Sequence, residues 1–156
     1  MNMSTINNYL VLMLSLTLFS LGCSSSDEPN SELPTVIFGH FFGECSGERC
    51  LETYMLQGES LFEDTNDSFT RDYNFVSLAD SLYLRVNDLR DLIPAELSDL
   101  EGQTFGCPDC GDQGGVYLQL ADQNDTEFFI DMDTNGIPDY LSEFVAEVNE
   151  RIALLP

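Results

Sequence analysis

The C-terminal segment, residues 137–155, constrains the fold more than any other part of the chain. Its apolar side chains recur every three or four residues, which is the spacing of one face of an α-helix. Pro138 and Asp139 stand in the first turn of this helix, where both residue types are favoured. An amphipathic helix of this kind must bury its apolar face against another layer of structure. The expected face consists of Tyr140, Leu141, Phe144, Val145, Val148, Ile152 and Leu155.

Segments in which apolar and polar residues alternate predict a sheet as that second layer. Residues 115–122 and 126–133 alternate in this way and form an expected hairpin. Residues 35–65 contain further alternating runs separated by turn residues, which predicts an antiparallel meander. Gly114 and Gly115 precede the hairpin and indicate a bulge or a close approach of two backbones. We therefore expect an α+β fold with an antiparallel sheet of about five strands.

The middle of the chain predicts a second helix over residues 78–93. Ser77 followed by Asp80 resembles a capping box, and Pro94 would end the helix. A strand is the alternative, because residues 82–86 also alternate. We favour the helix, and we expect it to pack with the C-terminal helix on one face of the sheet. The positions at helical spacing are Leu78, Leu82, Val86, Leu89 and Ile93.

The N-terminus carries an apolar run, residues 9–22, that is too short to span a bilayer comfortably and suits the core of a signal peptide. Cys23 directly follows this run, after a small residue, as in a bacterial lipobox whose thiol is diacylated. The alternative is an N-terminal anchor helix with an incidental cysteine. We favour a lipoprotein with a signal peptide at 1–22, a flexible acidic tether at 23–34 and one globular domain at 35–156.

The charge of the chain is strongly one-sided. It has 28 acidic residues against 5 basic ones, and its net charge is −23. Such a charge argues against nucleic acid or anionic lipid headgroups as partners. It favours cations, basic partners or solubility in salty surroundings. We expect a monomer that the N-terminal lipid attaches to a membrane.

Four further cysteines form two local pairs, Cys45 with Cys50 and Cys107 with Cys110. Two close pairs fit a four-thiolate zinc site, and the sequence CPDCG is similar to the knuckles of zinc ribbons and rubredoxins. Disulfides are the favoured alternative, because exported proteins fold in an oxidising compartment. Redox activity is disfavoured, because no helix begins after CPDC to lower a thiol pKa. The connectivity stays open among three possibilities.

The acidic turn DMDTNGIPD suggests a calcium site. Asp131, Asp133 and Asn135 occupy alternate positions before a glycine, as in the first half of an EF-hand loop, and Asp139 follows. The bidentate glutamate expected at the twelfth position is absent, since Ser142 stands there. The alternative is a strand end, an Asn-Gly turn and an aspartate at a helix N-terminus, all of which are satisfied without metal.

The sequence contains no motif of serine hydrolases, zinc proteases or phosphate-binding loops. His40 is the one histidine, and its place on an alternating apolar segment indicates a packed side chain or one at the sheet edge. No cofactor is required by these features, and zinc or calcium are the only ones suggested. The sequence therefore does not predict an enzyme.

Three segments, residues 22–28, 41–56 and 105–120, resemble small lipoproteins of marine Bacteroidota of the flavobacterial kind. The resemblance implies an outer-membrane lipoprotein, either periplasmic or exposed at the cell surface, and it carries no assigned activity and no catalytic residue. The function predicted from the sequence is a non-enzymatic accessory or interaction module of the cell envelope, with an envelope protein as partner. The alternative is a metal-binding protein that uses the four cysteines or the acidic turn.

Overall fold

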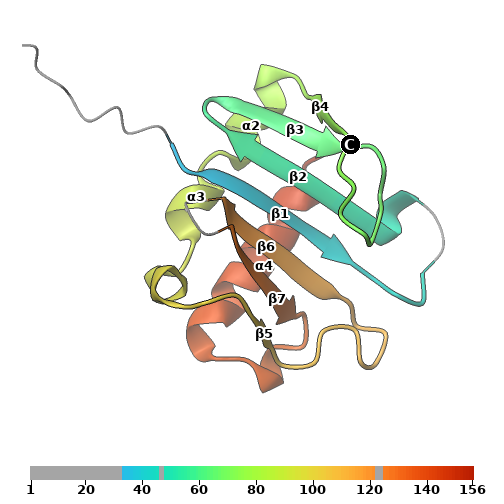
Figure 1. The fold of residues 1–156 in the computed structure, drawn as a ribbon, viewed down its shortest axis with the longest axis vertical. Helices are drawn as coiled ribbons and strands as arrows, with labels where there is room; N and C mark the ends of the chain where they lie inside the picture. Colours follow the sequence, from blue (N-terminus) through green and yellow to red (C-terminus); the bar gives the residue numbers. More distant parts are fainter. Residues whose placement is uncertain (1–32, 46–47, 122–124) are drawn as a thin grey trace, which may run out of the picture. The chain divides into compact units, whose positions relative to one another are not determined.

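A single mixed sheet organises the computed structural model, which describes residues 33–45, 48–121 and 125–156. Within these residues the strand order is β4-β3-β2-β1-β6-β7-β5 (Figure 1). All neighbouring strands are antiparallel except β5 and β7, which are parallel. The strands are β1 (Thr35–Phe41), β2 (Leu51–Gln57), β3 (Ser60–Asp64), β4 (Phe75–Ser77), β5 (Gln103–Phe105), β6 (Gly115–Ala121) and β7 (Thr126–Asp131).

The α+β class predicted from the sequence is confirmed, but the prediction of an antiparallel sheet of about five strands is wrong. The described part of the sheet has seven strands and is mixed. The two strands that were not expected, β4 and β5, lie at the two edges and have three residues each. Three residues are too few to show an alternating pattern, so these strands form through their neighbours rather than through their own sequence.

The connection between β5 and β6 explains the parallel pair. β5 ends beside the last residues of β7, with Phe105 opposite Ile130, and β6 begins opposite Asp131. The loop of residues 106–114 must therefore cross the end of β7 to reach β6. The CPDC sequence lies on this crossing.

One face of the sheet is buried under helix α4 (Asp139–Ile152), which lies behind the sheet in Figure 1. Alternate residues of each central strand point to this face, as Phe38 does between its neighbours Tyr54 and Leu118. The predicted helical face is confirmed, because six of its seven side chains are buried and Tyr140 packs against the core. The core also includes Val36, Leu56, Leu61, Val86, Leu89, Leu97, Val116, Phe128 and Ile130.

The middle segment is helical rather than a strand, as the sequence favoured, but the prediction of one helix over residues 78–93 is wrong. The chain instead forms α2 (Asp80–Val86), α3 (Leu89–Leu92) and a short 3₁₀ helix, η2 (Ala95–Asp99). Ser77 belongs to β4 and makes no cap, since α2 begins after Ala79.

The chain conformation between α2 and α3 is stabilised by an ion pair and by hydrogen bonds to other elements. Arg151 of α4 donates to both carboxylate oxygens of Asp88, at 3.1 and 2.9 Å. Arg90 donates to the backbone oxygens of Pro34 and Gly58, which ties α3 to the ends of β1 and β2. These contacts involve residues far along the chain, so the helical period alone could not predict them.

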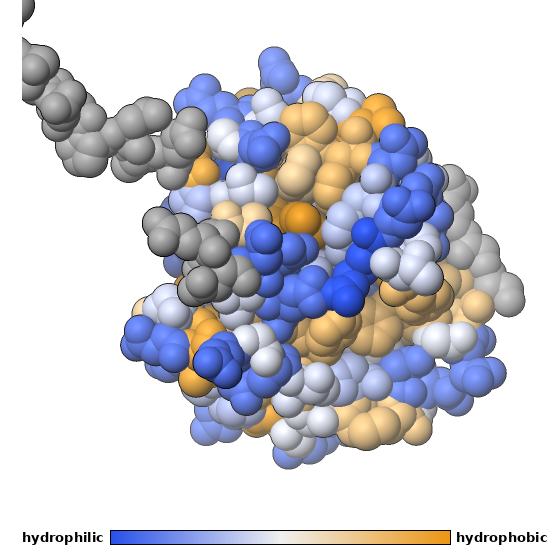
Figure 2. Space-filling view, in the orientation of Figure 1, coloured by the Kyte–Doolittle hydropathy of each residue, from blue (hydrophilic) through white to orange (hydrophobic). Residues whose placement is uncertain are grey.

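The opposite face of the sheet faces the viewer in Figures 1 and 2, and none of the described helices covers it. The loop of residues 65–74, between β3 and β4, folds back over it. Figure 2 shows apolar residues gathered over this open face, with a hydrophilic band crossing it. We call this surface the open face.

Candidate functional site

A cavity of about 220 Å³ lies on the open face, between the sheet and the loop of residues 65–74. Phe41, Tyr117 and Phe129 supply its floor from β1, β6 and β7. The rings of Phe41 and Phe129 meet edge to face with centroids 6.3 Å apart, and those of Tyr117 and Phe129 are tilted with centroids 5.3 Å apart. We call this the aromatic cavity. Its remaining lining residues are Leu51, Thr53, Ser68, Phe69, Arg71 and Tyr73.

The loop that roofs this cavity is held in shape by its own hydrogen bonds. The buried carboxylate of Asp64 accepts from the backbone amides of Asn66 and Asn74, at 3.2 and 2.6 Å. The Asn66 side chain donates to the backbone oxygen of Asp72 at 2.6 Å. Arg71 has a φ of 59°, a left-handed conformation that is unfavourable for a residue with a side chain. The loop is therefore built before any ligand arrives, and it places Arg71 over the sheet.

Arg71 forms an ion pair with Glu127 of β7 across the open face. The Tyr117 hydroxyl lies 3.1 Å from the other carboxylate oxygen of Glu127 and 2.9 Å from the Gln119 side-chain oxygen. Burial raises the pKa of Tyr117, so its phenol stays protonated at neutral pH. The polar groups of the cavity are thus an ion pair and neutral hydroxyls, which suit recognition better than proton transfer.

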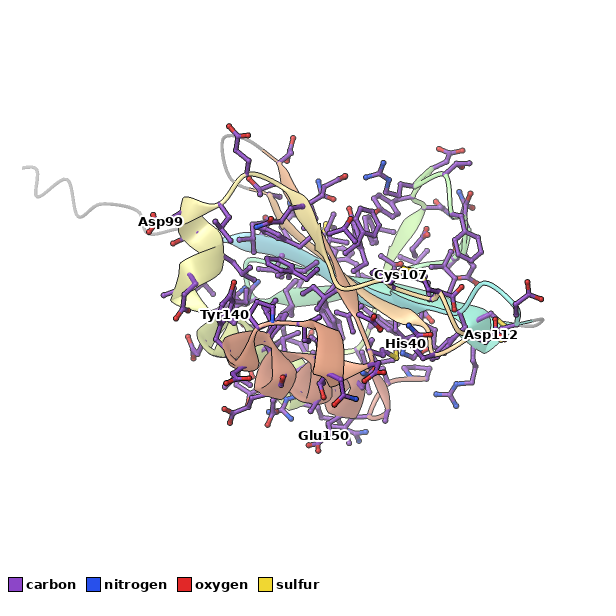
Figure 3. All side chains as sticks on the ribbon, turned by 90° about the horizontal axis from the view of Figure 1, so that it is seen from below. His40, Asp99, Cys107, Asp112, Tyr140 and Glu150 are labelled. Carbon is purple, nitrogen blue, oxygen red and sulfur yellow. A yellow bond between two sulfur atoms is a disulfide. The ribbon has the colours of Figure 1, made fainter. Side chains whose placement is uncertain are left out.

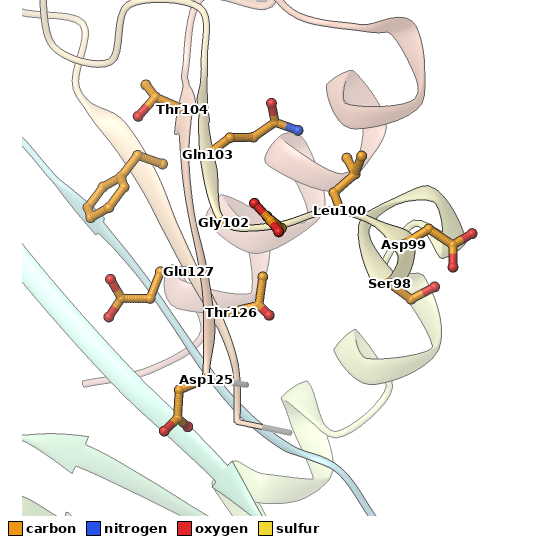
Figure 4. A pocket seen from close by; sticks show the side chains of 11 residues that line it. Ser98, Asp99, Leu100, Gly102, Gln103, Thr104, Asp125, Thr126 and Glu127 are labelled. Carbon is orange, nitrogen blue, oxygen red and sulfur yellow. The ribbon is translucent and has the colours of Figure 1, made fainter. Parts of the chain in front are cut away.

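A second hollow, of about 710 Å³, lies beside β5 at the sheet edge (Figure 4). Four carboxylate side chains line it, from Asp99, Glu101, Asp125 and Glu127. Phe129 lines both this hollow and the aromatic cavity. We call it the acidic groove. Its other lining residues are Ser98, Leu100, Gly102, Gln103, Thr104 and Thr126.

His40 lies on the other, helix-covered face, near one end of α4 (Figure 3). Its Nδ1 is 3.3 Å from the Asn149 side-chain oxygen, and its Nε2 is 3.7 Å from a carboxylate oxygen of Glu52. Glu52 is buried, and its other oxygen accepts a hydrogen bond from Arg49 at 3.1 Å. The arrangement places His40 at the margin of the core, as its sequence position suggested. Sequence reasoning did not identify Glu52 as its neighbour.

The favoured disulfide prediction is confirmed. Cys45 is bonded to Cys50 and Cys107 to Cys110, so the connectivity is local and each bond stiffens its own turn. Each of these four sulfurs is therefore bonded to the other sulfur of its own pair in this structure. The zinc site stays a prediction for the reduced protein.

The two cysteine loops lie next to each other, which the sequence did not predict. Asp109, between the cysteines of CPDC, accepts hydrogen bonds from the backbone amides of Gly43 at 2.7 Å and Gly114 at 3.2 Å. The close approach expected at Gly114 and Gly115 is present. A Cβ atom on Gly114 would lie 2.8 Å from the Phe41 backbone oxygen, and one on Gly115 would lie 2.8 Å from Pro108.

Asp131, which the sequence suggested as a calcium ligand, uses its carboxylate to hold the crossing loop. It accepts from the Cys107 amide at 2.9 Å, the Gln113 side chain at 2.9 Å and the Asp133 amide at 2.8 Å. Burial raises its pKa, but the three hydrogen bonds outweigh burial and leave the pKa below its ordinary value.

The other suggested calcium ligands are placed in local turns. Asp133 accepts from the backbone and side-chain nitrogens of Asn135, at 3.1 and 2.6 Å, and begins the 3₁₀ helix η3 (Thr134–Gly136). Asp139 is the first residue of α4. Among the residues that the structure describes, no group of three or more His, Cys, Asp or Glu side chains could hold a metal ion. The calcium site stays a prediction.

Cys23, the predicted signal peptide and nearly all of the predicted tether lie outside the described residues. In the described ranges, no helix is long and apolar enough to cross a bilayer. No protein-family model, curated protein or solved structure matches this chain. The candidate site therefore rests on geometry alone, and its main residues, Arg71 and Phe129, carry no motif that sequence reasoning could use.

Proposed function

We propose that this chain is a cell-envelope lipoprotein and a non-enzymatic interaction module that binds its partner on the open face. The observation that carries the binding role is the aromatic cavity, because it is apolar, preformed and set in a sheet face that no described helix covers. The attachment rests on Cys23 and the apolar run before it. Diacylation at Cys23 would hold the domain at a membrane through the tether.

Metabolic labelling tests the attachment. The full chain is expressed in a bacterial host with labelled palmitate and compared with the Cys23→Ser variant. We expect label and detergent-phase partitioning for the wild type only. Equal labelling of both proteins would contradict lipidation at this residue.

Photocrosslinking tests the binding surface. A photoreactive residue replaces Phe69, which is 63% exposed at the rim of the aromatic cavity. The control carries the same residue in place of Leu84, which is 70% exposed on α2 and lines no part of the cavity. We expect a discrete adduct in the native envelope from position 69 only. Identical adduct patterns from both positions would count against the open face as the binding surface.

A further inference from the structure

The aromatic cavity and the acidic groove form one continuous surface. Phe129 is a wall of both. Glu127 of the groove is paired with Arg71 of the cavity, so this ion pair marks the boundary between them. An occupant that extends from the cavity past Phe129 therefore comes to lie beside the carboxylates of the groove.

The charge of this surface is unbalanced. Four carboxylates line the groove and no arginine lines it, while the nearest cation, Arg71, is paired with Glu127. The whole chain carries −23, so its field adds to the local one. An anionic ligand would be repelled, and so would a second copy of this chain. A cationic ligand would be attracted over a distance set by the ionic strength.

The groove also runs along β5, the last strand of the described sheet. Gln103 and Thr104 belong to both β5 and the groove. The outer side of β5 has no neighbouring strand in the part of the chain that the structure describes. Such an edge accepts an extended peptide as an additional strand.

We propose that the ligand of the open face is a basic, extended peptide segment of another protein, with one aromatic or aliphatic side chain in the aromatic cavity and lysine or arginine residues along the acidic groove. This proposal rests on the binding role proposed above. The cavity, at about 220 Å³, suits a single side chain, because sites for drug-sized ligands begin at about 300 Å³. The anchor supplies apolar burial, and the basic residues supply orientation and speed of association.

Fluorescence anisotropy with the full chain tests this proposal. The probe is a blocked, labelled nonapeptide with one central Phe flanked by alternating Lys and Ser. Two matched peptides replace Phe by Ala or every Lys by Glu, and cellohexaose serves as a neutral sugar competitor. We expect binding of the probe, a loss of about tenfold or more without the Phe anchor, and no binding of the Glu peptide.

Variants of the protein test whether the peptide binds at the acidic groove. Asp99→Asn with Asp125→Asn removes two exposed charges of the groove, and Asn tolerates the left-handed φ of 47° at position 125. We expect this double variant to weaken binding about threefold to tenfold at 50 mM salt, with the difference fading at 300 mM. The control, Glu143→Gln with Glu150→Gln on α4, should stay within about twofold of wild type.

Three outcomes would overturn the proposal: equal binding of the Glu peptide, equal weakening by the control variant, or binding of cellohexaose instead of the peptides. Phe129→Ala adds a separate check on the anchor, provided that its melting temperature shows it folded. If Phe129→Ala does not fold, the charge variants still test the proposal. A failure of every peptide together with a specific adduct from position 69 would refute the peptide ligand and leave the binding surface standing.

Discussion

Replacing Asp131 by asparagine tests whether this carboxylate holds the crossing loop over the end of β7. Asparagine keeps the shape and one acceptor oxygen, but its amide group donates where the second oxygen accepted. With the asparagine amide toward Cys107, one of the three hydrogen bonds is lost, and a donor then faces the part-buried backbone amide of Cys107. Losing a charged acceptor and setting two donors against each other should cost about 2–3 kcal/mol in the free energy of unfolding.

This cost should depend on pH, and its sign follows from the pKa. The pKa of Asp131 in the folded protein lies below the 3.8 of an unperturbed aspartate. Its stabilising contribution is therefore complete above about pH 4–5 and is lost as the pH falls through the folded-state pKa. A protonated Asp131 resembles asparagine, since each has one acceptor oxygen and one donor. The difference between wild type and variant should shrink in acid.

Urea unfolding followed by circular dichroism at pH 7, 5 and 3 measures this difference with the disulfides intact. Asp112→Asn is the control for general charge removal, because Asp112 is exposed on the same loop. We expect Asp131→Asn to lower stability at pH 7 by about 2–3 kcal/mol more than the control does. A difference that stays constant down to pH 3, or no difference from the control, would refute the reasoning.

Four further changes test the turns and loops. Gly106→Ala should cost about 3 kcal/mol, because φ is 71° and the added Cβ would lie 2.7 Å from that of Asp131. Gly58→Ala, at a φ of 54° with open space around it, should cost only about 1–2 kcal/mol, and equal losses in thermal melts would contradict the steric account. Asp109→Ala should cost about 2 kcal/mol, because two backbone amides lose their acceptor, and a melting temperature equal to that of Asp112→Ala would contradict this. Reduction of both disulfides should cost about 2 kcal/mol for each short loop and raise the intact mass by about 4 Da, whereas a chelator-sensitive adduct would favour zinc.

The parts of the fold that sequence reasoning predicted are those with strong local signals. The hairpin of β6 and β7 has alternation in both strands, and α4 has a full apolar face with Pro138 as its N-cap. Local pairing of the cysteines was one of the connectivities left open, and short separations make it geometrically easy. In each case the residues that determine the structure lie close together in the sequence.

The parts that sequence reasoning missed depend on distant residues. The break after α2 is held by Arg151 from the far end of the chain. β5 has a single half-buried side chain, Phe105, and becomes a strand only because β7 lies beside it. The candidate site has the same origin, since Arg71 reaches its partner Glu127 only after the loop folds over the sheet. Periodicity and motifs do not report such contacts.

The parallel placement of β5 has a consequence for how the molecule assembles and opens. β5 precedes β7 in the chain but has no partner until β7 is in place, so it joins the sheet after the hairpin. With three residues and one bonded side, it should also exchange its amide hydrogens sooner than the central strand β1. The acidic groove therefore borders an edge of the sheet with low cooperative stability. Addition of a further strand there would protect β5 itself, so occupancy of the groove and the order of this edge would rise together.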